Sequence, residues 1–257
     1  MLGRYLRYRW KAKTEYDVHS PFLFDFIEHV LKDDRGFYIF EEIEQLRKQL
    51  LLLDSELSVV DFGAGSKKSN KPKRKISDIA KNTLITPKFG RMLFHLAGHY
   101  NSTNILELGT SLGISTLYLA GAKKRSNIIS LEGSPEIAAC AQQNFEKLHV
   151  ENIDILTGEF SQTLPKALET LKTIDLAFID GNHRRDPTIQ YFEQILPFCH
   201  IHSILVFDDI HWSREMEQAW DYIVKNNNVT LSIDLFFKGI VFLTKDLHEK
   251  TAVTIQF

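Results

Sequence analysis

The chain has 257 residues, of which 44% are hydrophobic and 25% are charged, a composition typical of a globular protein. Its 31 Lys and Arg residues nearly balance 33 Asp and Glu residues, which argues against a globally basic nucleic-acid-binding protein. Two cysteines, Cys140 and Cys199, are too few for a disulfide scaffold or a cysteine-rich zinc site. No apolar run approaches the roughly 18 residues that span a bilayer, and the first ten residues lack the apolar stretch of a secretory signal. We therefore expect a cytoplasmic protein.

Residues 1–80 are predicted to form a mainly helical N-terminal extension. Helical patterns cover residues 15–32 and 38–53, and a short strand pattern covers residues 58–63. The segment KKSNKPKRK at 67–75 combines positive charge with proline, which opposes local folding, so we interpret it as a basic loop. Helical patterning then resumes from about residue 76 to residue 100.

Residues 81–257 are predicted to form an α/β domain. Short apolar runs alternate with amphipathic stretches, and the runs occupy residues 104–109, 127–133, 152–159, 173–180 and 202–209. Such runs are typical of strands buried on both faces, and their alternation with helices predicts parallel β-α-β units in a doubly wound, Rossmann-like sheet. Two further runs within 229–245 are separated by a short turn, which predicts an antiparallel hairpin and a sheet of seven strands.

The turn after the first of these strands has the pattern E-x-G-x-x-x-G, formed by Glu107, Gly109 and Gly113. Glycine lets the backbone turn tightly and approach a ligand, and the helix that follows offers unpaired amide groups. Ser111 occupies the place of the second glycine in a dinucleotide-binding motif, which argues against a nicotinamide cofactor. A second glycine-rich turn, DFGAGS at 61–66, is followed by basic residues and then a helical pattern, so we interpret it as structural.

Carboxylates end the next two predicted strands. Glu132 ends the second strand, where an acid can accept both hydroxyl hydrogens of a ribose, and Gly133 follows it. Glu159 ends the third strand and is a candidate acceptor for an adenine amino group. The alternative for both acids is a solvated side chain.

Three further acids follow the fourth and fifth strands. Asp180 closes one and Asp208 and Asp209 close the other, and a right-handed crossover makes these strands neighbours. Three converging carboxylates repel one another unless a cation or protons intervene, and an all-oxygen set suits Mg²⁺ or another hard divalent ion. The alternative is that one acid caps a helix or, as Asp180, binds a cofactor directly while the others are solvated.

His183 lies three residues after Asp180 in the sequence Asp-Gly-Asn-His. Histidine titrates near neutrality, so it suits the removal of a proton from a hydroxyl nucleophile. We predict His183 and Asp180 as catalytic residues, with a solvent-facing loop histidine as the alternative.

Together these residues resemble the class I S-adenosylmethionine-dependent methyltransferases. The resemblance covers about residues 83–245 and is carried by LELGTSLG, ISLEGSPE, LAFIDGNH and VFDDIHW. It is closest to the metal-dependent O-methyltransferases, which include the catechol, caffeoyl-CoA and macrolide sugar enzymes. The resemblance implies S-adenosylmethionine as cofactor, with a methionine-binding turn of Glu107, Gly109, Thr110, Ser111 and Gly113, a ribose-binding Glu132, and an adenine-binding pair of Glu159 and Phe160.

The chain departs from the catechol-type pattern at two places. His183 replaces a lysine base, and Asp208-Asp209 replaces Asp-Asn, as in the macrolide sugar enzymes. The expected activity is methyl transfer to a hydroxyl oxygen of a small-molecule acceptor, with a divalent metal as a second cofactor. We expect no membrane partner. Two alternatives stay open: an RNA-binding or RNA-modifying protein that uses residues 67–75, and a nicotinamide-dependent oxidoreductase.

Overall fold

The computed structural model describes residues 2–14, 20–60, 73–245 and 249–257. Two compact units divide the chain: one is Asp33–Leu171, and the other combines Met1–Lys32 with Lys172–Phe257. We refer to them as the central unit and the terminal unit. The predicted division at residue 80 stays a prediction.

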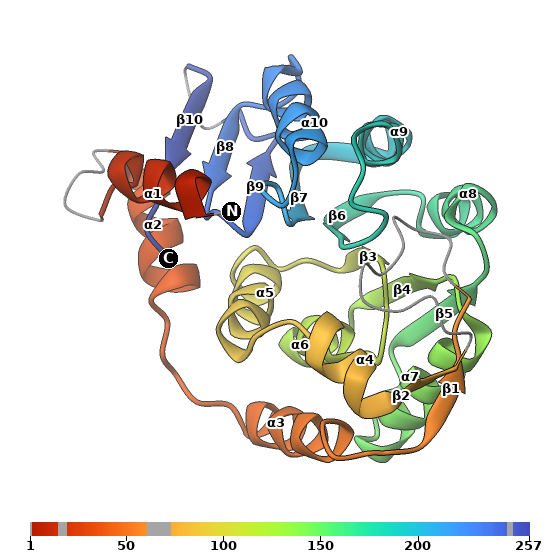
Figure 1. The fold of residues 1–257 in the computed structure, drawn as a ribbon. Helices are drawn as coiled ribbons and strands as arrows, with labels where there is room; N and C mark the ends of the chain where they lie inside the picture. Colours follow the sequence, from red (N-terminus) through yellow and green to blue (C-terminus); the bar gives the residue numbers. More distant parts are fainter. Residues whose placement is uncertain (1, 15–19, 61–72, 246–248) are drawn as a thin grey trace. The chain divides into compact units, whose positions relative to one another are not determined.

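The central unit contains helices on either side of a parallel three-stranded sheet. Its elements are α3 (Tyr38–Leu50), β1 (Glu56–Ser58), β2 (Lys73–Lys75), α4 (Ile76–Thr83), α5 (Pro87–His99), β3 (Asn104–Leu108), α6 (Ile114–Ala122), β4 (Asn127–Glu132), α7 (Pro135–Lys147), β5 (Ile153–Thr157) and α8 (Phe160–Leu171). β4 pairs with both β3 and β5 in parallel. Figure 1 shows α6 and α7 on one side of these strands and α8 on the other. Burial of Leu106 and Ile128 with no exposed surface explains why these strands are continuous apolar runs.

The predicted helix over residues 76–100 is divided into α4 and α5. α4 ends at Thr83 and α5 begins at Pro87. Proline disfavours the helical conformation of the residue before it but suits the first turn of a new helix, and the hydroxyl of Thr86 accepts the Phe89 N–H at 3.4 Å. The sequence Thr86-Pro87 is therefore the local reason why two helices form where one was predicted.

A short hairpin replaces part of the predicted basic loop. β1 pairs antiparallel with β2, so Lys73–Lys75 are extended and hydrogen-bonded. The strand expected at 58–63 begins earlier, at Glu56, and ends at Ser58. The second glycine-rich turn at 61–66 and the rest of the basic segment lie outside the described residues.

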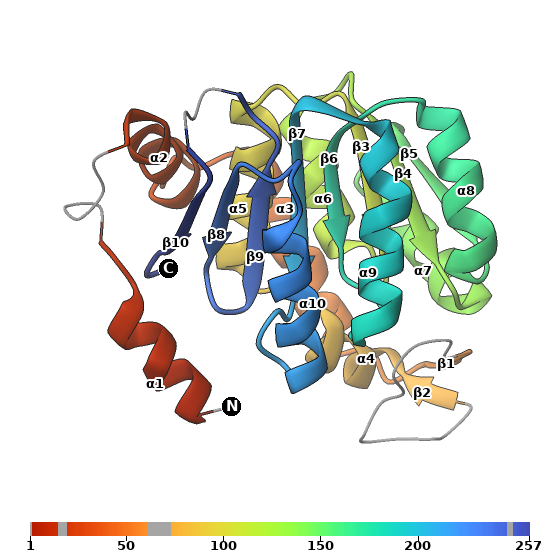
Figure 2. The same cartoon turned by 90° about the horizontal axis from the view of Figure 1, so that it is seen from above.

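The terminal unit contains a mixed five-stranded sheet in the order β10-β8-β9-β7-β6. Its elements are α1 (Leu2–Lys11), α2 (Pro21–Phe26), a π-helix (Ile27–Leu31), β6 (Ile174–Ile179), α9 (Arg185–Ile195), a 3-10 helix (Leu196–Phe198), β7 (Cys199–Asp208), α10 (Arg214–Lys225), β8 (Leu231–Asp234), β9 (Lys238–Phe242) and β10 (Thr251–Thr254). Figure 2 shows α9 and α10 side by side. Of the predicted helix over residues 15–32, the structure describes residues 20–32 and begins α2 at Pro21.

The strand pairings confirm the predicted α/β class. β6 and β7 are parallel, and β8 and β9 form the predicted antiparallel hairpin. β10 adds a strand parallel to β8, so the two units hold three and five strands of the main sheet where the sequence predicted seven in all. Among the described residues, no helix is both long and apolar enough to cross a bilayer.

Candidate functional site

The glycine turn of the central unit connects β3 to α6. Gly109 has a φ of 105° and Gly113 a φ of 84°, a left-handed region that glycine adopts without steric cost. Gly113 is also the N-cap of α6, and a Cβ atom there would collide with the Phe145 ring of α7. The turn thus requires glycine at Gly113 for its backbone and for its packing.

Glu132 lies against this turn and hydrogen-bonds to it. The Ser111 N–H donates to Oε2 of Glu132 at 2.9 Å, and the Ser134 N–H donates to Oε1 at 2.9 Å. The Gly109 N–H donates to the Leu131 carbonyl at 2.9 Å. The structure therefore brings the predicted methionine-binding turn and the predicted ribose-binding acid together.

Glu107 lies beneath the turn with no exposed surface. The hydroxyls of Thr116 and Ser130 donate to its Oε2 at 2.5 Å and 2.6 Å, and burial raises the pKa of its carboxyl to about 7. Its Oε1 is buried and has no hydrogen-bond partner among the described residues. Buried polar atoms in native proteins are normally paired, so this oxygen fits a donor supplied by a ligand.

The end of β5 lies next to the end of β4. The Gly158 N–H donates to the Glu132 carbonyl at 2.9 Å. Glu159 is exposed and Phe160, the first residue of α8, is half-buried. The two predicted adenine-binding residues, and Gly133 with Glu132, therefore lie at the carboxyl ends of adjacent strands.

Sequence reasoning missed several residues around the turn. The Thr83 and Ser111 hydroxyl oxygens are 2.7 Å apart, although Thr83 ends a helix in a segment without a motif. Asn144 donates its side-chain N–H to the Leu112 carbonyl at 3.0 Å. Ser130 of β4 is the register partner of Glu107 of β3, so it could be identified only from the alignment of these two strands.

The terminal unit holds the predicted acids at the ends of β6 and β7. Ile179 pairs with Phe207, which confirms that these strands are neighbours and places Asp180 beside Asp208. Asp209 has a φ of 53°, and its N–H donates to Oδ1 of Asp208 at 2.6 Å.

Lys238 is a fourth member of this cluster, which we call the acidic centre: Asp180, Asp208, Asp209 and Lys238. Its ammonium group forms an ion pair with Asp208 and lies 5.7 Å from the centre of the Phe178 ring. Lys238 is only 5% exposed. No motif marks it in the sequence.

Proton affinities in the acidic centre are strongly perturbed. Burial and the Asp208 charge raise the pKa of Asp180 well above its ordinary value, and the same causes raise the pKa of Asp209 to about 6. Burial alone would also raise the pKa of Asp208, but the Lys238 ammonium lowers it. The carboxylates Asp208, Asp180 and Asp209 outweigh burial and raise the pKa of Lys238. Burial and like charge therefore raise the proton affinity of Asp180, while the ion pair with Lys238 favours the ionised form of Asp208.

His183 contacts the acidic centre from the loop before α9. Its Nε2 is 3.5 Å from Oδ1 of Asp180, and its side chain is 30% exposed. The structure thus brings together the two residues predicted to be catalytic, with part of the imidazole open to solvent.

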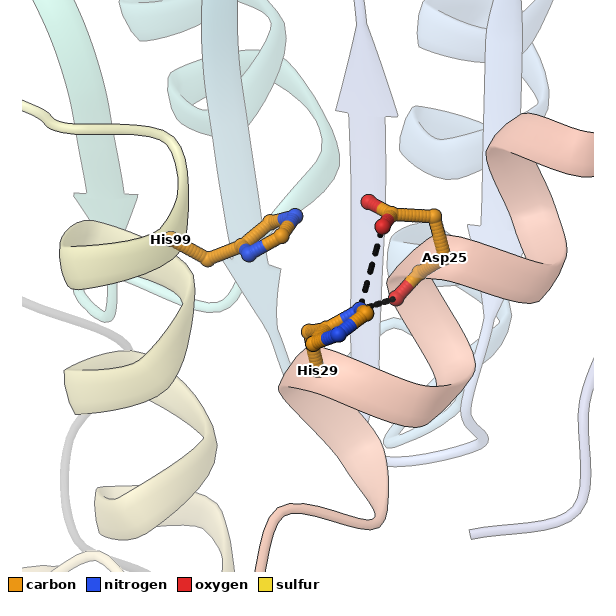
Figure 3. Close-up of side chains that lie close together, drawn as sticks. All are labelled: Asp25, His29 and His99. Atoms are coloured by element: carbon orange, nitrogen blue, oxygen red, sulfur yellow. Dashed lines mark hydrogen bonds and ion pairs between the residues drawn. The ribbon is translucent and has the colours of Figure 1, made fainter.

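Another histidine and carboxylate pair lies at the other end of the terminal unit's sequence. Nδ1 of His29 is 3.0 Å from Oδ1 of Asp25, one helical turn away, as Figure 3 shows. Both side chains are exposed, which is typical of a surface pair that stabilises a helix by a few tenths of a kcal/mol. We assign it no part in the site.

Known proteins resemble the segment that contains these residues. Residues 106–210, fewer than half of the chain, match the family model described as a methyltransferase domain. The catechol O-methyltransferase of Niastella koreensis is 33% identical over 129 residues, which are 49% of this chain and 58% of that protein. The catechol O-methyltransferase of Mycobacterium tuberculosis is 28% identical over 133 residues, 49% of this chain and 56% of that protein. The chain thus spans little more than half the length of these relatives.

The fold is that of solved methyltransferases. The O-methyltransferase from Bacillus cereus, solved in complex with SAH, superimposes with a TM-score of 0.58 and 19% identity, over 85% of this chain and 96% of that one. Fold and sequence matches confirm the predicted resemblance to the class I S-adenosylmethionine-dependent O-methyltransferases.

Proposed function

We propose that the protein transfers a methyl group from S-adenosylmethionine to a hydroxyl oxygen of a small-molecule acceptor. The single observation that carries this proposal is the hydrogen bond between the Ser111 N–H and Glu132, which joins the glycine turn to the acid at the end of β4. The similarity to two catechol O-methyltransferases supports a hydroxyl acceptor.

The central unit fits this cofactor on three counts. The unpaired, buried Oε1 of Glu107 can accept from a ligand amino group. The turn from Gly109 to Gly113 leads into the N-terminus of α6, whose first N–H groups have no partner within a helix and suit a carboxylate. Glu132 lies at a strand end, where acids bind ribose hydroxyls, with Glu159 and Phe160 beside it for the adenine.

The chain's own residues supply binding, orientation and proton transfer. When bound, S-adenosylmethionine supplies a methyl group already activated on a sulfonium. His183 accepts the proton of the acceptor hydroxyl through its imidazole, and Asp180 orients that ring. Alignment of the acceptor also contributes to the rate, because a methyl transfer needs the nucleophile in line with the bond that breaks.

Calorimetric titration with S-adenosylhomocysteine tests the cofactor assignment. We expect the wild-type chain to bind it and to bind NAD with no measurable heat. Glu132→Gln keeps an oxygen for the Ser111 N–H but loses the charge, and hydrogen bonds to charged groups are worth about 1.5–3 kcal/mol, so affinity should fall about 10- to 100-fold.

Glu151→Gln is the matched control, because Glu151 is exposed in the loop before β5. Its affinity should equal that of the wild type. Absence of heat with S-adenosylhomocysteine, or equal affinity in the Glu132→Gln variant, would contradict the proposal. Measurable heat with NAD but not with S-adenosylhomocysteine would favour the nicotinamide-dependent oxidoreductase.

A further inference from the structure

We propose that the Lys238 ammonium takes the place of the divalent cation expected among the three aspartates, so that the acidic centre works without a metal ion. This inference rests on the proposed methyl transfer for its catalytic meaning. The three acids predicted as metal ligands do not fit a divalent ion as they stand, because a cation of the chain is already paired with Asp208.

The position of this cation follows from strand register. Asp208 and Lys238 are direct partners in the antiparallel pairing of β7 and β9. Direct partners place their side chains on the same face of the sheet, with Cβ atoms about 4.5–5.5 Å apart. The backbone therefore brings the two side chains to the same place, and burial of Lys238 keeps its ammonium away from solvent.

The hairpin before Lys238 holds this register. The Leu235 N–H donates to the Lys238 carbonyl at 2.9 Å, and the Phe236 N–H donates to Oδ1 of Asp234 at 2.8 Å. The Asp209 N–H donates to the Phe237 carbonyl at 2.6 Å, which ties the same hairpin to the acidic centre. Lys238 is thus fixed at both its backbone and its charged end.

The Asp208 carboxylate is already engaged by the chain. Its Oδ1 accepts the Lys238 ammonium and the Asp209 N–H. A hard divalent ion needs several free oxygen ligands, and at this place it would be repelled by the positive charge of the Lys238 ammonium. The ammonium also satisfies the physical requirement that three converging acids have a nearby cation.

The buried pair is mutually dependent. Lys238 is 5% exposed and the Asp208 side chain 12% exposed, so either charge alone would be costly. Among the described residues, Asp180 and Asp209 also act on the ammonium, and His183 contacts Asp180. Lys238 is accordingly a positioning residue: its ion pair with Asp208 holds a positive charge next to Asp180, the acid that contacts His183.

Binding of Mn²⁺, followed by electron paramagnetic resonance on the full chain after dialysis against chelator, tests this proposal. We expect the wild type to bind no stoichiometric Mn²⁺ at millimolar concentration. Lys238→Met removes the ammonium and should create a stoichiometric Mn²⁺ site. Lys238→Arg is the matched control: it keeps the positive charge and should bind none.

Stoichiometric Mn²⁺ binding by the wild type that disappears in Asp208→Asn would overturn the proposal, as would a folded Lys238→Met variant that binds none. Wild-type binding that survives in Asp208→Asn would place the ion elsewhere and leave the acidic centre metal-free. Should Lys238→Met fail to fold, the wild-type and Asp208→Asn measurements still decide whether the acidic centre binds a metal ion. This test measures metal binding, whereas the proposed methyl transfer is tested by titration with S-adenosylhomocysteine. A failure of one proposal can therefore be told apart from a failure of the other.

Discussion

His211 lies between two carboxylates in the loop that follows the acidic centre. Its Nδ1 is 3.2 Å from Glu217 and its Nε2 is 2.8 Å from Asp234, and its ring stacks on Phe236 at 5.2 Å between centroids. Burial by itself lowers the pKa of His211, but the two acids outweigh burial and raise it. The two carboxylates therefore favour the protonated form of His211, and the histidine in turn connects its loop to Glu217 and Asp234.

The raised pKa predicts how stability depends on pH. A histidine whose pKa is higher in the folded state stabilises the protein fully below the unfolded pKa of about 6.5, and this contribution disappears as pH rises through the folded pKa. His211→Asn should therefore lower the denaturant midpoint more at about pH 5.5 than at about pH 8.5. Urea titrations at both pH values measure this difference.

His202→Asn serves as the control, because His202 is exposed on β7. Its effect on the midpoint should be small and the same at both pH values. A loss in the His211→Asn variant that is equal at both values would mean that packing on Phe236, and not charge, is what His211 contributes.

Single residues of the site were predictable where a strand end marked them. Glu132 ends one apolar run and Asp180 directly follows another, and the carboxyl end of a parallel strand is where ligand-binding acids are expected. Thr83 and Lys238 were not predictable, because one ends a helix without a motif and the other belongs to an apolar hairpin. Only the folded chain places them beside Ser111 and Asp208.

The start of α6 shows how one element depends on the packing of another. Gly113 is left-handed, and its missing Cβ makes room for the Phe145 ring of α7. Asn144, the preceding residue of α7, binds the carbonyl of Leu112. α7 thus supports the turn that we propose binds the cofactor through two consecutive side chains.

Gly113→Ala should destabilise the protein and weaken cofactor binding together. A non-glycine residue in this conformation costs about 1–3 kcal/mol, before the collision with Phe145 is added. Thermal denaturation with and without S-adenosylhomocysteine should give a lower midpoint and a smaller shift on ligand addition.

Gly98→Ala is the control within the central unit, since a Cβ atom there meets nothing within 4 Å. Alanine in α5 should leave stability unchanged or raise it by up to about 1 kcal/mol, because glycine is the more flexible in the unfolded chain. An unaltered ligand shift in the Gly113→Ala variant would argue against the turn as the cofactor site.

In the terminal unit, the two ends of the sequence are joined. The buried Tyr8 hydroxyl donates to the Ile255 carbonyl at 2.6 Å and accepts the Phe257 N–H at 3.3 Å. The Lys13 N–H donates to the Thr254 carbonyl at 2.8 Å. Residues near the start of the sequence therefore hold the segment at and after β10 in place, and Lys13 and Ile255 form an isolated parallel bridge.

Tyr8→Phe should lower the free energy of unfolding by about 1 kcal/mol, since it removes a buried hydroxyl and leaves the Ile255 carbonyl unpaired. Its affinity for S-adenosylhomocysteine should be unchanged, because Tyr8 belongs to the terminal unit. Tyr5→Phe, at an exposed ring of the same helix, is the control and should change neither quantity in denaturation and calorimetry. A fall in affinity for Tyr8→Phe would mean that the two units are coupled.

Local patterns in the chain are enough to predict the α/β class, the parallel strands and the glycine turn, because burial on both faces and a tight turn each impose a pattern on neighbouring residues. They also predict that three acids gather near the ends of β6 and β7. Tertiary structure alone decided which cation meets them, since the pairing of Asp208 with Lys238 depends on the register of β7 against β9. Residues that are far apart in the chain leave no periodic pattern that predicts such a pairing. The position of the Lys238 ammonium beside Asp208 is therefore evident only from the folded structure.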